Sequence, residues 1–218
     1  MNTRTSIISC FAAFLLANIA NAQTNIDPNN KYSWGENIGF MNWRNAGSPS
    51  GSQGAIIAGS FISGIIWCEN VGYVNLGDGT PTNGSSYANA TGTDFGVNIL
   101  GDNRLSGLAW GENIGWLNFG PFATLAPEQH ARYEIERRRL RGYAWAENVG
   151  WVNLDDTNHY VGTICPADFN QDGIVDFFDY LDFVDAFSAN VLSADFNGDM
   201  VIDFFDYLDF VDAFSGGC

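Results

Sequence analysis

Residues 110–119 read WGENIGWLNF, and closely related phrases occur three more times in the chain. The other copies are WGENIGFMNW from Trp34, WCENVGYVNL from Trp67 and WAENVGWVNL from Trp145. In each copy an Asn and a Gly stand between two short stretches of apolar residues. Gly adopts positive φ freely and Asn tolerates it, so the motif predicts a tight turn that joins two strands.

The residues around this turn extend the repeat to a three-stranded unit. After the turn, Trp116 and Asn118 alternate with Leu117 and Phe119, which is the pattern of a strand with two different faces. Three copies share a lead-in (FISGIIW, RLSGLAW and RLRGYAW), and the segments GAIIAGS, FGVNIL and ARYEIE precede these lead-ins as candidate lead strands. The sequence therefore predicts an all-β repeat domain over residues 30–164.

The first copy lacks lead strands of its own. Residues 158–164 could supply one of them by pairing back to the N-terminal segment. That pairing would close the array as a propeller or a barrel, whereas an open β-solenoid fits the same pattern.

Composition limits the classes of function. The chain has 218 residues, with 25 acidic and 9 basic side chains and a formal net charge of −16. Nucleic-acid binding needs a basic face, so we expect no nucleic-acid partner.

The first 22 residues have the features of a secretory signal peptide. Arg4 forms a short basic region, an apolar run follows, and Ala20-Asn21-Ala22 is a typical cleavage site. The run is too short to span a membrane, so we expect a secreted protein, extracellular or at the cell surface, without a membrane span.

An acidic and aromatic phrase is duplicated near the C-terminus, as DFNQDGIVDFFDYLDFVDAF (168–187) and DFNGDMVIDFFDYLDFVDAF (195–214). The first copy places oxygen-bearing residues at the spacing of an EF-hand calcium loop, with Gly173 at the position of the sharp turn. The predicted ligands of the first Ca²⁺ are Asp168, Asn170, Asp172, Asp176 and Asp179, with the backbone carbonyl of Ile174. Carboxylates this close would repel one another without a cation.

The second copy predicts a second and weaker Ca²⁺ site. Its ligands would be Asp195, Asn197, Asp199, Asp203 and Asp206, with the backbone carbonyl of Val201. Met200 replaces Gly at the turn position, and a left-handed backbone there costs a side-chain-bearing residue about 1–2 kcal/mol. Each loop leads into a predicted helix, and Tyr180, Phe183, Val184 and Phe187 form its buried stripe.

Two loop–helix units without entering helices resemble a dockerin. The flanking CPADFNQDG and the closing GGC are similar to the GC-type variant that ends secreted bacterial proteins. The resemblance covers residues 165–218 and implies a small all-α, Ca²⁺-binding module that mediates attachment or complex assembly. It also implies a cohesin-like or cell-surface protein as the partner.

Two departures concern the presumed partner face. In cellulosomal dockerins the tenth and eleventh loop positions are usually small and polar, whereas this chain has aromatic residues there. These residues either pack against the other repeat or form an adhesive face for a partner, and they are Phe177, Phe178, Phe204 and Phe205.

Three cysteines remain after the signal peptide. Cys165 and Cys218 bracket the duplicated phrase, and an oxidising compartment favours pairing, so we predict a disulfide between them. Cys68 is then unpaired, and its place beside Trp67 predicts a buried thiol.

The sequence contains no convincing catalytic set. Four Glu residues recur at equivalent turn positions, which indicates repeat architecture; a catalytic pair is normally asymmetric. They are Glu36, Glu69, Glu112 and Glu147. The Trp residues of the repeats are expected in the core, with stacking on sugars as the less favoured role. The basic run at 137–141 is expected to be a solvated strand edge.

These observations favour a secreted, non-catalytic protein with a binding or structural β domain and a Ca²⁺-binding attachment module. The alternative is a carbohydrate-active protein, in which the β domain binds or hydrolyses a polysaccharide.

Overall fold

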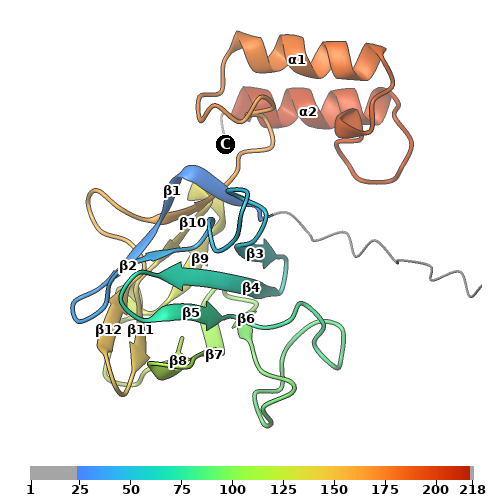
Figure 1. Cartoon of the computed structure of the whole chain (residues 1–218). Coiled ribbons are helices and arrows are strands. Elements are labelled where there is room, and N and C mark those ends of the chain that lie inside the picture. The colour runs from blue at the N-terminus through green and yellow to red at the C-terminus, as the bar shows by residue number, and fades with distance from the viewer. Residues whose placement is uncertain (1–23, 217–218) are drawn as a thin grey trace, which may run out of the picture.

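The computed structural model describes residues 24–216. The predicted signal peptide and Cys218 lie outside the described residues. Strands fill the first part of the described chain, through Thr163, and two helices follow the last strand (Figure 1). The predicted class, an all-β repeat domain followed by two helices, is confirmed, and the β domain is a closed barrel.

Eight antiparallel strands form the barrel within residues 24–216. They are four hairpins, one for each copy of the repeated motif: β1 (Ile26–Gly35) with β2 (Gly39–Asn42), β4 (Phe61–Cys68) with β5 (Gly72–Asn75), β7 (Leu105–Gly111) with β8 (Gly115–Asn118), and β11 (Tyr143–Ala146) with β12 (Gly150–Asn153). The turn glycines have φ values between 73° and 84°, as predicted.

Pairing between β1 and β12 closes the barrel, with Trp34 opposite Asn153. The Asn of each turn supports this closure, because its Nδ2 donates to a backbone carbonyl of the preceding hairpin. The bonds run from Asn37 to Val149, Asn70 to Ile38, Asn113 to Val71 and Asn148 to Ile114, at 3.0–3.1 Å. The four bonds form a complete ring. The turns are tight as predicted, but none of these four Asn residues has positive φ, so that part of the prediction is wrong, and their side chains join neighbouring hairpins.

The lead strands lie outside the barrel path. They are β3 (Ala55–Ala58), β6 (Val97–Ile99) and β9 (Arg132–Glu134), which pair with β4, with β4 and β7, and with β10 (Arg139–Arg141). The expected pairing of the last segment is confirmed, because β13 (Val161–Thr163) pairs with β1. Short 3-10 turns cover Pro127–Gln129, Ile135–Arg137 and Leu192–Ala194.

The barrel interior is built in layers of equivalent residues. One layer consists of Trp43, Leu76, Phe119 and Leu154, all essentially inaccessible to solvent. Another consists of the residues that follow each repeat Trp, and all four are small: Gly35, Cys68, Gly111 and Ala146. A Cβ at Gly35 would lie 2.6 Å from Ile38 Cγ1, so this layer has no room for large side chains.

Cys68 fills one of these small positions. Its thiol is fully buried, and Sγ donates to the Ile38 carbonyl at 3.1 Å. The prediction of a buried, unreactive packing thiol at this position agrees with this environment.

The basic run at 137–141 differs from the prediction of a solvated edge. Arg139 and Arg141 form ion pairs with Asp155 at 2.7 and 3.1 Å, and Arg141 also pairs with Glu134 at 3.0 Å. β10 is not an edge strand, because it pairs with β9 on one side and with β13 on the other, whereas the Arg137 side chain of the same run is exposed.

Helices α1 (Phe177–Ser188) and α2 (Phe204–Gly216) pack side by side (Figure 1). The rings of Phe183 and Phe210 stack at 3.9 Å in the centre, and both are fully buried. Tyr180 lies near Phe214 and Phe187 lies near Tyr207, so the helices run antiparallel. The predicted buried stripe of the first helix is confirmed.

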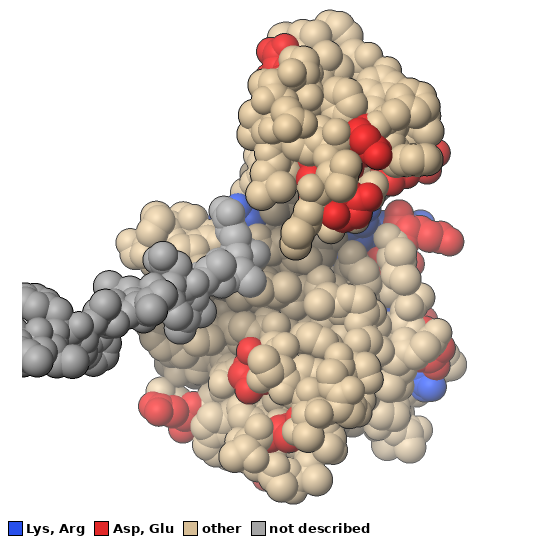
Figure 2. Space-filling model, turned by 90° about the vertical axis from the view of Figure 1, so that its right-hand side faces the viewer, with Lys and Arg blue, Asp and Glu red and all other residues tan. Residues whose placement is uncertain are grey.

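No helix within residues 24–216 is long and apolar enough to cross a membrane. On the face shown in Figure 2, basic atoms are few, and most of them lie at the narrow junction between the barrel and the helical lobe.

Candidate functional site

The predicted ligands of the first loop all turn toward the loop's own backbone. Their carboxylate or amide oxygens accept backbone N–H groups, and the loop curls around them. The bonds are Gly173 N to Asp168 Oδ2 (2.9 Å), Asp172 N to Asn170 Oδ1 (2.9 Å), Ile174 N to Asp172 Oδ1 (2.9 Å), Phe178 N to Asp176 Oδ1 (2.8 Å) and Asp176 N to Asp179 Oδ2 (2.8 Å). Asp176 also caps α1.

The second loop has the same arrangement. Its acceptors are Asp195 (from Gly198 N and Met200 N), Asn197 (from Asp199 N), Asp199 (from Val201 N), Asp203 (from Phe205 N) and Asp206 (from Phe196, Asn197 and Asp203 N). Backbone N–H donation, that of Asp203 above all, lowers the pKa of the Asp206 carboxyl. The duplicated sequence therefore folds into two equivalent loops.

Asp168 distinguishes the first loop from the second. Its side chain is only 4% exposed, and Oδ1 is buried without a hydrogen-bond partner. Burial, together with repulsion from Asp179 and Asp172, raises the pKa of the Asp168 carboxyl. At the equivalent position of the second loop, both oxygens of Asp195 accept backbone N–H groups.

The donor chemistry of both loops fits a hard divalent cation. The predicted ligands are oxygen atoms of carboxylates, an amide and a backbone carbonyl in each loop, which is the set that Ca²⁺ prefers. Within residues 24–216, no three carboxylate, thiol or imidazole groups already stand together as a metal site. The carboxylates of the loops are instead occupied by backbone N–H groups, and the buried Oδ1 of Asp168 is an oxygen that still lacks a partner.

The loops differ at two positions where the backbone has positive φ. The first loop has Gln171 (60°) and Gly173 (91°), and the second has Gly198 (78°) and Met200 (70°). Each loop thus contains one Gly and one residue in a strained left-handed conformation, so this strain by itself does not make the second loop the weaker one.

Gly173 of the first loop lies against the barrel, and its φ of 91° is the main reason for Gly at this position, because the nearest barrel atom belongs to the end of the exposed Asn29 side chain. A Cβ at Gly173 would overlap with the amide nitrogen of Asn29 in β1. Asp168 and Gly173 line a cavity of about 110 Å³ together with Asp27 and Arg138 of the barrel. Met200, by contrast, is 86% exposed.

The four Phe residues at the helix starts are not packed against the other repeat. Phe177, Phe178, Phe204 and Phe205 are each 64–65% exposed, so the packing interpretation is wrong and they lie at the surface. Because Cys218 lies outside the described residues, the Cys165–Cys218 disulfide stays a prediction.

The barrel wall presents a second feature that the sequence interpretation missed. The repeat Trp residues were expected in the core, but Trp34, Trp110, Trp116 and Trp151 are 38–41% exposed on the outer face. In each hairpin the repeat Trp forms an edge-to-face aromatic pair at 4.6–4.8 Å: Trp34 with Phe40, Trp67 with Tyr73, Trp110 with Trp116 and Trp145 with Trp151. Four aromatic ridges therefore stand on the wall, one over each hairpin.

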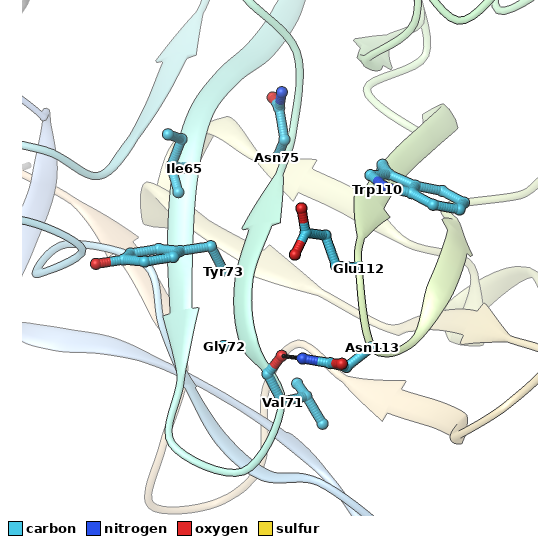
Figure 3. Close-up of a pocket in the computed structure, with 8 residues that line it drawn as sticks. All are labelled: Ile65, Val71, Gly72, Tyr73, Asn75, Trp110, Glu112 and Asn113. Atoms are coloured by element: carbon cyan, nitrogen blue, oxygen red, sulfur yellow. Dashed lines mark hydrogen bonds between the residues drawn. The ribbon is translucent and has the colours of Figure 1, made fainter.

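Grooves separate neighbouring ridges. The groove between β5 and β7 has a volume of about 400 Å³, and its lining includes Gly72, Tyr73, Asn75, Trp110, Glu112 and Asn113 (Figure 3). The groove between β8 and β11, about 390 Å³, is lined at the same repeat positions by Gly115, Trp116, Asn118, Trp145, Glu147 and Asn148. All four repeat Glu side chains are exposed at the hairpin turns.

No protein-family model matches this chain, and comparisons with curated proteins and with solved structures find no similar protein.

Proposed function

We propose that this chain is a secreted, non-catalytic attachment protein, with a dockerin-like C-terminal module that binds Ca²⁺ and a β-barrel that serves as a binding or structural module. One observation carries the proposal. Two equivalent oxygen-rich loops each lead directly into a helix whose first two residues are exposed Phe side chains. Ca²⁺ bound in the two loops would hold them in one conformation and would thereby position the exposed Phe side chains that follow them.

The exposed aromatic residues form a symmetric row. Phe177 stacks on Tyr180 at 6.0 Å and Phe204 stacks on Tyr207 at 6.1 Å. The two Tyr hydroxyls lie 3.1 Å apart and connect the halves of the row. Solvent-exposed aromatic rings that adjoin one another are typical of a protein-binding surface, which supports docking on a cohesin-like or cell-surface protein.

The two loops would hold Ca²⁺ through the predicted ligands: Asp168, Asn170, Asp172, Ile174, Asp176 and Asp179 in the first, and Asp195, Asn197, Asp199, Val201, Asp203 and Asp206 in the second. Bound Ca²⁺ would supply positive charge among the carboxylates. The chain's own residues position those oxygens, since Asp179 and Asp206 are fully buried and each accepts backbone N–H groups from its own loop.

Calcium titration of the full secreted chain tests the first half of the proposal. Calorimetry should give two sites, and Asp172→Ala and Asp199→Ala should each remove one. EGTA should reduce the circular dichroism signal of the two C-terminal helices, here called the tail (residues 165–216), while the β-sheet signal of the barrel persists. An unchanged spectrum and melting point in EGTA would contradict the proposal.

The attachment role needs a separate measurement. Immobilised cohesin modules and washed cell envelopes of the source organism should retain the full chain in Ca²⁺, and the Phe177→Ser/Phe204→Ser double variant should be released. Retention that is equal for the two proteins would refute a role for the aromatic row.

A carbohydrate-active protein is the second candidate, and the exposed aromatic ridges of the barrel favour it. Incubation of the full chain with neutral and acidic polysaccharides, followed by a reducing-end assay, separates binding from hydrolysis. Release of new reducing ends would replace the non-catalytic proposal.

A further inference from the structure

Each groove of the barrel wall offers a ligand aromatic rings and a carboxylate, and both grooves present them at the same repeat positions. Aromatic ridges flank each groove, and a carboxylate lies between the ridges. In Figure 3, Glu112 stands between β5 and β7, while the rings of Tyr73 and Trp110 extend to opposite sides, over their own hairpins. The second groove repeats this with Glu147 between ridges that include Trp116 and Trp145.

Hydrogen-bonding groups are already oriented in both grooves. The side-chain oxygens of Asn75 and Asn118 accept the backbone N–H groups of Gly77 and Gly120 at 2.9 and 2.7 Å. This leaves the Nδ2 group of each amide as a donor in the lining of a groove that also contains a carboxylate. A ligand with both donor and acceptor groups, such as a row of hydroxyls, would satisfy both partners.

We propose that these grooves are binding subsites for a neutral polysaccharide, whose sugar rings stack on the aromatic ridges and whose hydroxyls bond to Glu112 and Glu147. The inference rests on the proposed role of the barrel as a binding module. A pyranose has apolar C–H faces and a polar rim, so it matches ridges that alternate with carboxylates. Hydroxyl donation to a carboxylate gives a charge-assisted hydrogen bond.

Charge excludes an acidic glycan. The described residues that line the two grooves include a Glu in each and neither Lys nor Arg. Twelve of the 25 acidic residues lie in residues 165–218, so the repulsion of an anionic ligand at the wall comes from Glu112 and Glu147 themselves.

The direction of the rings argues against a small cation. An ammonium group is recognised by an aromatic cage that encloses it. Tyr73 and Trp110 point away from Glu112 and do not enclose the space in front of its carboxylate (Figure 3). Ridges on both sides of a groove instead suit an extended ligand that crosses from one hairpin to the next.

Titration calorimetry and tryptophan fluorescence on the full secreted chain test the proposal. The probes are cellohexaose, xylohexaose, mannohexaose and laminarihexaose, with their disaccharides, an oligogalacturonate and choline chloride. At least one neutral hexasaccharide should bind and should bind more tightly than its disaccharide. The Glu112→Gln/Glu147→Gln variant should weaken that binding at least tenfold, since it removes one charge-assisted hydrogen bond in each groove.

Glu136→Gln is the matched control, because Glu136 is exposed on the barrel outside both grooves and its loss should leave binding unchanged. Failure of every neutral hexasaccharide to bind would overturn the inference. So would preference for the oligogalacturonate, for choline, or binding that the double Glu variant does not weaken. Calcium titration of the same samples reports on the tail independently, so failure of the grooves and failure of the attachment module are distinguishable.

Discussion

Replacing Asp168 by Asn should stabilise the Ca²⁺-free protein while removing the first of the two proposed Ca²⁺ sites. Without a cation, Oδ1 of Asp168 is buried and accepts no hydrogen bond, whereas Oδ2 accepts from Gly173 N. A buried acceptor without a partner costs about 1–3 kcal/mol. Asn keeps one accepting oxygen and removes the charge, but its NH2 group takes the unpartnered position. We therefore expect a gain near the lower end of that range, about 1 kcal/mol.

Asp195→Asn is the matched control, because it makes the same change at the same position of the second loop. Both Asp195 oxygens accept backbone N–H groups at 2.9 Å, so the substitution turns one acceptor into a donor that faces another donor. This variant should lose about 1 kcal/mol without Ca²⁺. Urea unfolding of both variants in EGTA, followed by helical circular dichroism, measures the difference. Shifts of the same sign in the two variants would refute the reasoning.

The pH dependence gives a further check on Asp168. Burial raises its folded-state pKa, so this carboxyl contributes stability below its unfolded pKa of about 3.9 and loses that contribution as pH rises through the folded pKa. Asn cannot titrate. The advantage of Asp168→Asn over the parent in EGTA should therefore grow as pH is raised from about 4 to about 7, and an advantage independent of pH would show that the carboxyl is not perturbed.

Four other variants test further contacts of the barrel and of the helical module. Asn148→Ala removes one bond of the ring that joins the hairpins and should lower the barrel's free energy of unfolding by about 1 kcal/mol in urea titrations followed by near-UV circular dichroism. Met200→Gly relieves a left-handed residue and should stabilise the tail by up to about 1 kcal/mol, whereas Gly173→Ala should destabilise it by at least about 1–2 kcal/mol, both by thermal melting. Phe177→Ser/Phe204→Ser should leave the calcium affinity unchanged in calorimetry while it abolishes retention on the docking partner.

The strands of the barrel were predictable because their signal is local. Alternation and turn residues identified both strands of each hairpin, and the apolar segments that precede the lead-ins identified the outer strands. Closure was not predictable from any one repeat, because it depends on β1 meeting β12 and on Asn37 reaching the carbonyl of Val149 across the whole domain.

The orientation of the Trp residues was predicted wrongly, although a signal was present. The Trp residues occupy strand positions in every repeat and were therefore expected in the core. However, a small residue follows the first Trp of each copy. The interior of an eight-stranded barrel is just wide enough for its side chains to fill, and the four inward positions at this level accept only Gly, Cys or Ala. Trp, on the alternate face, must therefore point outward. The aromatic ridges are a consequence of the narrow interior.

The two tail loops show what sequence spacing can and cannot indicate. The spacing identified the residues whose side-chain oxygens turn toward the loop backbone, because the curvature of a loop is a property of its local sequence. It could not indicate that the first loop packs on the barrel, since that contact joins Gly173 to Asn29 across more than half the chain. Burial of Asp168 arises at the same junction. Duplicate sequences thus acquire different physical properties through their surroundings. The loop against the barrel contains a buried carboxylate oxygen without a partner, whereas the exposed loop has both oxygens of Asp195 paired. The buried Oδ1 of Asp168, which has no hydrogen-bond partner, is therefore the main electrostatic difference between the two loops.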